Sequence, residues 1–282
     1  MILSMARCTI IDAGFYTSIQ DTGRLRARDY GVPHSGAMDL YSAGQANTIL
    51  GNAANTAVLE MTMTGGTFMF SDPTLIAITG ALCEVTHGQK KQLTPCVLHI
   101  KTGDVVSMSA AKDGNFMYLA IAGGFQVASY LDSASYFPGL LDTALLSKGS
   151  FLSYEPVKAA GTTTPFETPN FKGSLKAYRG AEFHVLNRQQ QEQLLGKSFT
   201  VSKNWNRMAF QLVEPIVNDL NPIPSSPVIP GTVQLTPAGK LIVLMRDAQT
   251  TGGYPRVLQL TQESINELSQ RTVGMAVDFV IG

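Results

Sequence analysis

The sequence predicts a mainly β protein that contains a few short helices. Short runs of alternating apolar and polar residues recur along the chain. Gly, Pro, Asn and Asp separate these runs at intervals of roughly 8–12 residues, and few stretches have helical spacing of apolar residues. Many short strands joined by tight turns are typical of sheets that close into barrels, so we expect two β-barrel lobes.

The first half of the chain supplies many of the expected strands. Residues 1–19 alternate around Cys8, Ile10 and Ile11 and predict an opening strand. Residues 67–81 predict two strands around a Ser-Asp-Pro turn, and residues 98–109 predict two more around a Thr-Gly-Asp turn. The apolar run 116–122 is short for a helix and predicts a buried strand.

The clearest helix begins after Ser35, which we expect to be its N-cap. Gly51-Asn52 supplies the stop signal at the other end. One face of this helix carries small and apolar residues, namely Met38, Ser42, Ala43, Ala46, Ile49 and Leu50. These small side chains predict that the helix lies close against a sheet.

We divide the chain into an N-terminal β-rich lobe (residues 1–158), a linker (159–175) and a C-terminal β-barrel lobe (176–282). The linker begins with the run AAGTTTPFETP, which is rich in Thr and Pro and poor in apolar residues. The C-terminal lobe predicts strands at 182–186, 199–202, 209–213, 233–235, 241–245 and 277–281, with helices at 189–195 and 262–268. A Gly-Thr strand, a Pro-containing turn and an apolar strand follow one another at 66–78 and again at 231–244, which suggests lobes of similar topology.

Composition excludes several functional classes. Lys plus Arg number 21 and Asp plus Glu number 21, so the balanced charge gives no case for binding nucleic acid or an anionic membrane. Cys8, Cys83 and Cys96 are widely spaced, and the four histidines form no metal-ligand pair, so we expect no metal site. No apolar run approaches the length that spans a membrane, and we expect a cytoplasmic protein.

A first candidate site lies between Gln20 and Gly66. Turn glycines alternate there with charged and amide side chains, which are Gln20, Asp21, Arg24, Asp39, Asn47, Asn52 and Glu60. Polar turns beside packed elements often carry binding chemistry. Asp21 and Asp39 are candidates for general acid or base catalysis, and Arg24 is a candidate for anion binding. A surface loop followed by an ordinary helix is the alternative interpretation.

A second candidate site is the run RDAQTTGGYPR at 246–256, which follows the predicted strand 241–245. Adjacent glycines let backbone N–H groups turn toward one point and form an anion-binding nest, and an arginine adds a fixed charge. Asp247 is the catalytic candidate here. The predicted substrate- and anion-binding residues are Arg24, Arg207, Gln234, Gln249, Thr250, Thr251, Gly252, Gly253, Tyr254 and Arg256. A hairpin with exposed charges is the alternative, whereas the site hypothesis expects both segments to line one pocket.

Two common catalytic motifs are missing from the sequence. The chain has no G-x-x-x-x-G-K-[ST] run, so any nucleotide is not held by a P-loop. Ser35 lies in His-Ser-Gly rather than in G-x-S-x-G, so the sequence does not support a nucleophile elbow.

An ordered set of motifs resembles a known family. It consists of DTGR at 21–24, GVPHSGAMD at 31–39, Ala46-Asn47, Gly51-Asn52, Leu59-Glu60 and DAQTTGGYPR at 247–256. These motifs are similar to those of the family formed by biotin-dependent carboxyltransferases and the C-type subunits of 5-oxoprolinase, which is also known as allophanate hydrolase subunit 2 and includes KipA-type proteins. The resemblance covers most of the chain and implies that the lobes are cyclophilin-like β-barrels.

The resemblance implies one component of a larger enzyme. Members of the family act with a B-type (KipI-like) protein and with an A-type protein, and they open the ring of 5-oxoproline at the expense of ATP. A small lactam or amide is therefore the implied substrate, and ATP is the implied cofactor, shared with the partner proteins. Biotin would be involved only in a carboxylase complex. The alternative is a KipA-like binding module that sequesters a kinase-inhibitor-type protein without catalysis.

The sequence departs from the family pattern at several polar positions. Trp205-Asn206 stands where the family usually has Ser-Asp, and Ser226-Pro227 lies where Glu and Gly are usual. Ala134 lies where an arginine often occurs, and Ala27-Arg28-Asp29-Tyr30 replaces a Gly-Tyr stretch. These changes bear on whether the chain is catalytic or binds the usual substrate.

Overall fold

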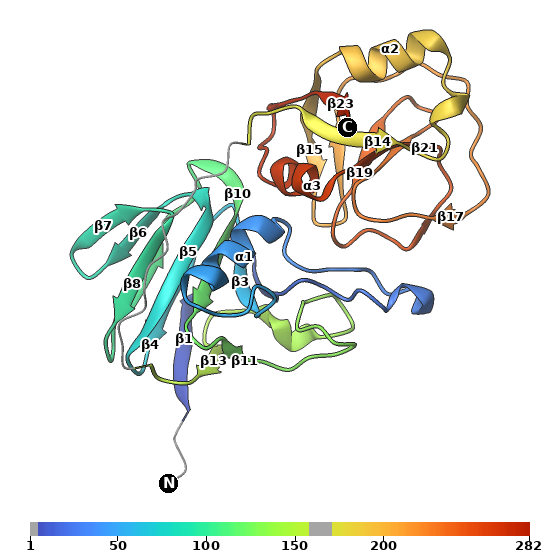
Figure 1. The fold of residues 1–282 in the computed structure, drawn as a ribbon. Coiled ribbons are helices and arrows are strands. Elements are labelled where there is room, and N and C mark those ends of the chain that lie inside the picture. Colours follow the sequence, from blue (N-terminus) through green and yellow to red (C-terminus); the bar gives the residue numbers. More distant parts are fainter. Residues whose placement is uncertain (1–4, 158–170) are drawn as a thin grey trace. The chain divides into compact units, whose positions relative to one another are not determined.

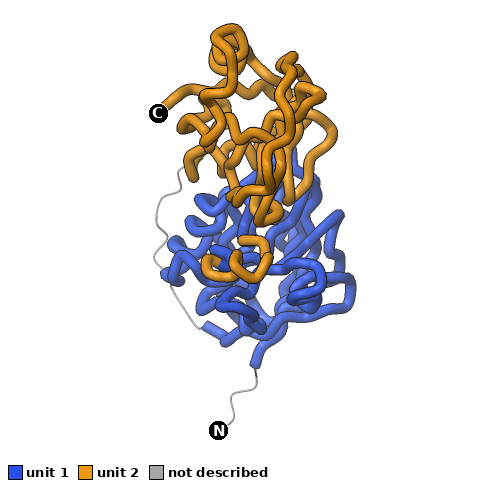
Figure 2. Tube along the Cα trace, turned by 90° about the vertical axis from the view of Figure 1, so that its right-hand side faces the viewer, with its two compact units in different colours: residues 1–24, 35–169 blue, residues 25–34, 170–282 orange. Residues whose placement is uncertain are grey.

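The computed structural model describes residues 5–157 and 171–282. It divides the chain into two compact units, which Figure 2 colours separately. Unit 1 comprises Met1–Arg24 and Ser35–Pro169, and unit 2 comprises Leu25–His34 and Asn170–Gly282. The short segment Leu25–His34 therefore belongs with the C-terminal part of the chain. Residues 159–170 of the predicted linker lie outside the described residues.

Unit 1 contains two antiparallel sheets, and Figure 1 labels most of their strands. The larger sheet has the order β11-β13-β1-β4-β9-β6-β7. Its strands are β1 (Ala6–Asp12), β4 (Thr67–Phe70), β6 (Glu84–His87), β7 (Lys90–Leu93), β9 (Val105–Met108), β11 (Phe125–Gln126) and β13 (Phe151–Tyr154). Alternate residues of β1 and β4 are buried, as expected for strands with one face on a core.

The second sheet of unit 1 has the order β12-β2-β3-β10-β5-β8. Its strands are β2 (Thr17–Gln20), β3 (Val58–Thr62), β5 (Thr74–Leu82), β8 (Cys96–Ile100), β10 (Asp113–Ile121) and β12 (Leu145–Leu146). One core cluster contains Phe68 and Phe70 from the first sheet and Ile76, Met117 and Leu119 from the second. The main core therefore lies between the two sheets.

Helix α1 (Leu40–Ile49) packs against β3, β5 and β10, on the face of the second sheet that points away from the main core (Figure 1). Ser42, Ala43, Ala46 and Ile49 are buried, which confirms that the small face of the helix lies against a sheet. The predicted N-cap is wrong. Asp39 caps the helix by accepting from the backbone N–H of Ser42, whereas Ser35 lies in a left-handed turn at φ +56°.

Unit 2 is built around an eight-stranded sheet with the order β22-β15-β16-β19-β18-β21-β14-β23. Its strands are β14 (Leu175–Arg179), β15 (Phe199–Trp205), β16 (Ala209–Leu212), β18 (Thr232–Leu235), β19 (Leu241–Leu244), β21 (Arg256–Leu260), β22 (Ala276–Val277) and β23 (Phe279–Ile281). A separate two-stranded pair joins β17 (Ser226–Pro227) to β20 (Thr251–Gly252). This small pair links the segment around Pro227 to the second candidate site.

Helices α2 (Arg188–Gly196) and α3 (Gln262–Ser269) complete unit 2, and both lie where the sequence predicts a helix. Asn187 and Gln190 form a capping box at the start of α2, and Thr261 caps α3. The predicted strand at 182–186 is wrong, because Phe183–Val185 forms a short 3-10 helix, η3. Two further 3-10 helices are η1 (Arg28–Tyr30) and η2 (Asp142–Ala144).

Strands dominate the described residues, which contain three α-helices and a nearly closed, barrel-like sheet. The predicted mainly β, barrel-like fold class is confirmed. The similar topology predicted for residues 66–78 and 231–244 is not found in the strand pairing. β18 pairs with β19, whereas β4 and β5 lie in different sheets. In the described residues, no helix is long and apolar enough to cross a membrane.

Candidate functional site

Asp21 is the centre of a hydrogen-bond network at the end of β2. Its Oδ1 accepts from the backbone N–H of Gly23 at 2.7 Å and from the hydroxyls of Ser133 and Ser135 at 2.7 Å and 2.6 Å. Its Oδ2 accepts from the backbone N–H of Ala134 at 2.7 Å. This carboxylate therefore joins the DTGR turn to the loop at 133–135. Asp21 thus has a structural role, whether or not it also takes part in catalysis.

Arg24 is fully buried and also binds this loop. Its Nε donates to the carbonyl of Tyr130 at 3.3 Å, and its Nη2 donates to the carbonyl of Ser135. Leu131 and Asp132, between these two carbonyls, have positive φ angles of +52° and +61°. A guanidinium that binds carbonyls inside the fold stabilises a tight loop.

Asp39 is a buried helix cap. Its Oδ1 accepts from the backbone N–H of Ser42 at 3.1 Å, and its Oδ2 accepts from the Ser42 hydroxyl at 2.5 Å. A carboxylate at this position is stabilised by the helix dipole and by the free N–H groups of the first turn. The predicted acid/base candidate thus also defines where α1 begins.

A row of buried polar side chains crosses the second sheet beneath α1. Ser18 on β2, Glu60 on β3, Tyr118 on β10 and Thr79 on β5 are neighbours across successive strand pairs. The Tyr118 hydroxyl donates to Glu60 Oε2 at 3.0 Å, and the backbone N–H of Met38 donates to the same oxygen at 2.7 Å. All four side chains of the row are fully buried, so these hydrogen bonds are formed away from water.

The environment of Tyr118 disfavours its ionisation. Burial raises the pKa of Tyr118 well above its ordinary value of 10.0, and the charges of Glu60 and Asp39 raise it further. The phenol therefore stays protonated and donates to Glu60, while it accepts from the backbone N–H of Asp39 at 2.8 Å.

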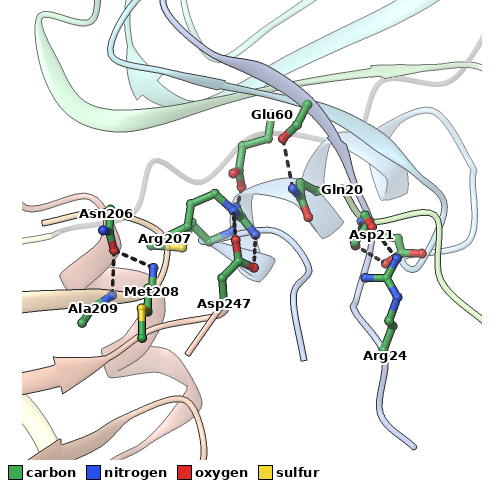
Figure 3. A network of polar contacts seen from close by, with 12 residues as sticks. Gln20, Asp21, Arg24, Glu60, Asn206, Arg207, Met208, Ala209 and Asp247 are labelled. Atoms are coloured by element: carbon green, nitrogen blue, oxygen red, sulfur yellow. Dashed lines mark hydrogen bonds and ion pairs between the residues drawn. The ribbon is translucent and has the colours of Figure 1, made fainter. Parts of the chain in front are cut away.

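In unit 2, Arg207 and Asp247 form a two-point ion pair, drawn in Figure 3. Nε lies 2.8 Å from Oδ2 and Nη2 lies 3.0 Å from Oδ1. Their side chains are 9% and 11% exposed, so the pair is largely removed from water. The predicted anion binder and the predicted acid/base residue bind each other.

Asn206 stands where the resemblance leads us to expect an aspartate, and its side chain acts as a hydrogen-bond acceptor. Its Oδ1 accepts from the backbone N–H groups of Met208 at 2.8 Å and Ala209 at 3.0 Å (Figure 3). A side-chain oxygen that caps the following turn needs no negative charge, so an asparagine is sufficient for this role.

Arg256 also has a carboxylate partner. Its Nε and Nη2 lie 2.8 Å and 2.6 Å from the two oxygens of Glu182, and its Nη1 donates to the carbonyl of Pro227 at 2.9 Å. The hydrogen bond from Arg256 lowers the pKa of Glu182 below its ordinary value of 4.5. Arg256 therefore connects β21 to η3 and to β17.

The Thr251–Gly253 turn packs against Gln234. A Cβ on Gly252 would lie 2.5 Å from Nε2 of Gln234, which donates weakly to the carbonyl of Tyr254 at 3.4 Å. The carbonyl of Gly253 accepts from the backbone N–H of Ile223 at 2.9 Å. The predicted residues Gln234, Gly252, Gly253 and Tyr254 thus lie together in unit 2.

Arg28 connects the first candidate segment to the second. Its Nη2 donates to the carbonyl of Thr250 at 3.1 Å and to the carbonyl of Val228. The backbone N–H of Val228 also donates to the Thr250 carbonyl, at 3.0 Å. A charged group from Leu25–His34 therefore holds two chain segments of unit 2 together. The single pocket expected from both segments stays a prediction.

Comparison with known proteins identifies the family. Residues 30–281 match the family described as carboxyltransferase domain, subdomain A and B. The chain belongs to this family. The match covers far more than half of the chain and confirms the resemblance found in the motifs.

Relatives of this carboxyltransferase-domain protein include enzyme components. The C subunit of Escherichia coli 5-oxoprolinase is 33% identical over 278 residues, which is 96% of this chain and 90% of that protein. The urea amidolyase of Saccharomyces cerevisiae is 42% identical over 127 residues, 44% of this chain and 7% of that protein. The crystal structure of TTHA0988 has a TM-score of 0.88 over 98% of this chain and 56% of that chain, and at 24% identity it shows the fold alone.

The predicted anion-binding arginines of this carboxyltransferase-domain chain bind groups of the fold itself. The phosphates of a nucleotide need open N–H donors. Arg207 and Arg256 each place two nitrogens on a carboxylate, and Arg24 binds carbonyls, so these groups do not fit a nucleotide site by themselves. Among the described residues, no group of His, Cys, Asp and Glu could hold a metal ion.

Sequence reasoning assigned no role to several residues of these networks. Ser133 and Ser135 lie in a weakly patterned segment, and the partnership of Glu182 with Arg256 spans 74 residues. The clearest available signal was Glu60, since a carboxylate within the apolar run VLEM must be buried with partners or face solvent.

Proposed function

We propose that this chain is the C-type component of an ATP-dependent 5-oxoprolinase, a complex that hydrolyses the amide bond of a small lactam. The observation that carries the proposal is the similarity to the C subunit of Escherichia coli 5-oxoprolinase, which extends over 96% of this chain and 90% of that protein. A match over nearly the full length of both chains fits the same component of the complex rather than a shared domain.

The complex that we propose includes a B-type (KipI-like) protein and an A-type protein. The ion pairing of two predicted anion-binding arginines supports a requirement for partner proteins. Since Arg207 and Arg256 are paired with Asp247 and Glu182, we infer that the partner proteins supply most of the ATP site. The similarity to urea amidolyase supports a related carboxyltransferase complex as a variant of the proposal, and biotin would enter only there.

A second candidate function is a KipA-like binding module without catalysis. The same two ion pairs favour it, because each guanidinium already binds a carboxylate of the fold and is less open to a substrate. The two candidate functions differ in whether the assembled complex hydrolyses its substrate.

Co-expression of the chain with its A-type and B-type partners tests the proposal. The purified complex is expected to hydrolyse 5-oxoproline only when ATP is present and all three proteins are included. Asp247→Asn should lower turnover, because it removes the negative charge that binds Arg207 at two points, whereas Arg188→Ala, at an exposed pair with Glu192, should leave it unchanged. A stable complex that consumes no ATP with 5-oxoproline would favour the binding module.

A further inference from the structure

Strand β8 (Cys96–Ile100) lies at one edge of the second sheet of unit 1. It comes last in the order β12-β2-β3-β10-β5-β8, and within the described part of the chain it pairs only with β5, antiparallel (Figure 1). An edge strand has backbone N–H and C=O groups on one side that no strand of its own sheet binds. One side of the β8 backbone is therefore open to a further strand.

Val97 and His99 are the residues whose backbone groups point to this open side. The backbone N–H of Ala122, just after β10, donates to the carbonyl of Leu75 at 2.9 Å, so Leu75 faces β10. Backbone groups of successive residues in a strand point to alternate sides, so Ala77 also faces β10. His99 and Val97 lie opposite Leu75 and Ala77 in the β5–β8 register. They exchange no hydrogen bonds with these residues, so their own N–H and C=O groups point outward.

The open stretch is limited to these two residues. Pro95, on one side, has no backbone N–H. On the other side, the backbone N–H of Lys101 donates to Oδ2 of Asp104 at 2.8 Å, and its carbonyl accepts from the backbone N–H of Asp104 at 3.1 Å. The edge thus offers two donors and two acceptors, which belong to Val97 and His99.

Strand β8 lacks the features that usually protect an open edge. The edge strand of the other sheet, β7 (Lys90–Leu93), is fully exposed and carries two lysines, which discourage pairing with another strand. The sequence of β8, CVLHI, contains no Lys, Arg, Asp, Glu or Pro and is rich in strand-forming residues. Val97 is partly exposed and His99 is exposed, so the outward face of the strand is accessible.

We propose that β8 pairs with β8 of a second copy of this chain, so that two chains form a symmetric dimer through one continuous sheet. The two strands run antiparallel about a two-fold axis at Leu98, which places Val97 opposite His99 of the partner subunit. These two residues exchange both of their backbone hydrogen bonds, and the symmetry-related pair does the same. Every open N–H and C=O group of both edges is then bound.

The match of this edge with itself favours a second copy over an unrelated strand. A register shifted by two residues in one direction places His99 opposite Pro95, which has no N–H to donate. The opposite shift places Val97 opposite Lys101, whose N–H and C=O are already bound to Asp104. In the proposed register Lys101 lies opposite Pro95, so no two like charges face each other. Such a self-complementary patch is what a two-fold interface requires.

Sedimentation velocity of the full chain over a series of concentrations tests the dimer. Because the pairing covers a small area, we expect a weak dimer that forms at about 0.1 mM chain and dissociates on dilution. His99→Pro removes an N–H that makes no hydrogen bond to β5, so the edge tolerates it. The dimer loses two of its four hydrogen bonds, and we expect its dissociation constant to rise about tenfold or more. His99→Thr is the matched control, since it keeps the N–H and should leave the dimer intact.

Disulfide cross-linking tests the register and needs no proline in the strand. Cα atoms of a pair that exchanges both hydrogen bonds lie about 5.5 Å apart, within the range of a disulfide. An equal mixture of Val97→Cys and His99→Cys chains should therefore form a mixed disulfide several times faster than either variant forms one alone. The three native cysteines are buried, so the wild-type chain is the background control.

A chain that stays monomeric at millimolar concentration would overturn the inference. A dimer that His99→Pro leaves unchanged uses another surface, and a dimer that His99→Thr weakens as much as His99→Pro depends on the imidazole; either result also overturns it. If His99→Pro does not fold, the cross-linking decides, and equal rates for the mixture and the single variants would contradict the pairing. The inference concerns the chain alone and does not depend on the proposed function.

Discussion

Gly252 and Gln234 fit together in unit 2 with no room for an added methyl group. An ideal Cβ on Gly252 would lie 2.5 Å from Nε2 of Gln234, and 3.4 Å from both Cδ of Gln234 and Cγ1 of Val228. A side chain at position 252 therefore requires the amide end of Gln234 to move. This requirement is independent of whether the Thr251–Gly253 turn binds an anion.

Gly252→Ala is expected to lower the free energy of unfolding by about 1–3 kcal/mol, because the methyl group must displace the Gln234 side chain. In a Gln234→Ala background the same change should cost far less, since the clashing group is gone. Urea unfolding of the two single variants and the double variant measures this difference. Equal costs in both backgrounds would show that the close contact does not restrict residue 252.

Arg28→Ala is expected to loosen the chain segments around Val228 and Thr250. The guanidinium donates to both carbonyls, and the backbone N–H of Val228 donates to the Thr250 carbonyl. Its removal should speed hydrogen exchange at the Val228 amide about tenfold or more, while exchange in β10 stays unchanged. Arg26→Ala, at an exposed neighbouring arginine, is the control, and identical exchange in the two variants would contradict a clamping role for Arg28.

Asp21→Asn is expected to destabilise the protein by about 2–3 kcal/mol, since hydrogen bonds to a charged acceptor are stronger than those to a neutral one. The asparagine keeps the shape of the side chain, but one of its two terminal atoms becomes a donor that faces donors. Asp12→Asn, in a turn where the carboxylate accepts from Gly14, is the milder comparison. Similar midpoints in urea for both variants would argue against Asp21 as the centre of its network.

Glu182→Gln should reveal a pH-dependent contribution to stability. The hydrogen bond from Arg256 lowers the pKa of Glu182 in the folded state below 4.5, so the folded protein binds the proton less readily than the unfolded chain. The stability that this carboxylate contributes is fully present above pH 4.5 and is lost as the pH falls through the folded value. The difference in unfolding free energy between wild type and variant, about 1–2 kcal/mol at neutral pH, should shrink in that acidic range. A difference that stays constant down to acid pH would contradict the assignment.

The sequence predicts the motifs of this protein better than the partners of each motif residue. The helix in the first segment and its small face were predictable, because they depend on periodicity alone. Its N-cap was not, since Ser35 and Asp39 are both favourable capping residues and only the backbone places Asp39 next to Ser42. The 3-10 helix at Phe183–Val185 was mistaken for a strand, because a short apolar run fits either structure.

The candidate sites show the same limit. The sequence identifies Arg207, Asp247 and Arg256 as charged residues near turns, but charge alone does not say whether a guanidinium faces a ligand or a carboxylate. Arg256 meets Glu182 from a segment 74 residues away. Glu60 and Tyr118 meet across two strands, and neither local propensity nor turn chemistry specifies that pairing. Such contacts depend on long-range register, which the chain encodes only through the whole sheet.

The proposed role in a 5-oxoprolinase is tested most directly by the rate of 5-oxoproline hydrolysis in a mixture of this chain with its A-type and B-type partners and ATP. We predict ATP-dependent opening of the lactam ring that disappears when this chain is left out. Hydrolysis at the same rate without this chain, or a complete complex that assembles and never consumes ATP with 5-oxoproline, would contradict that role.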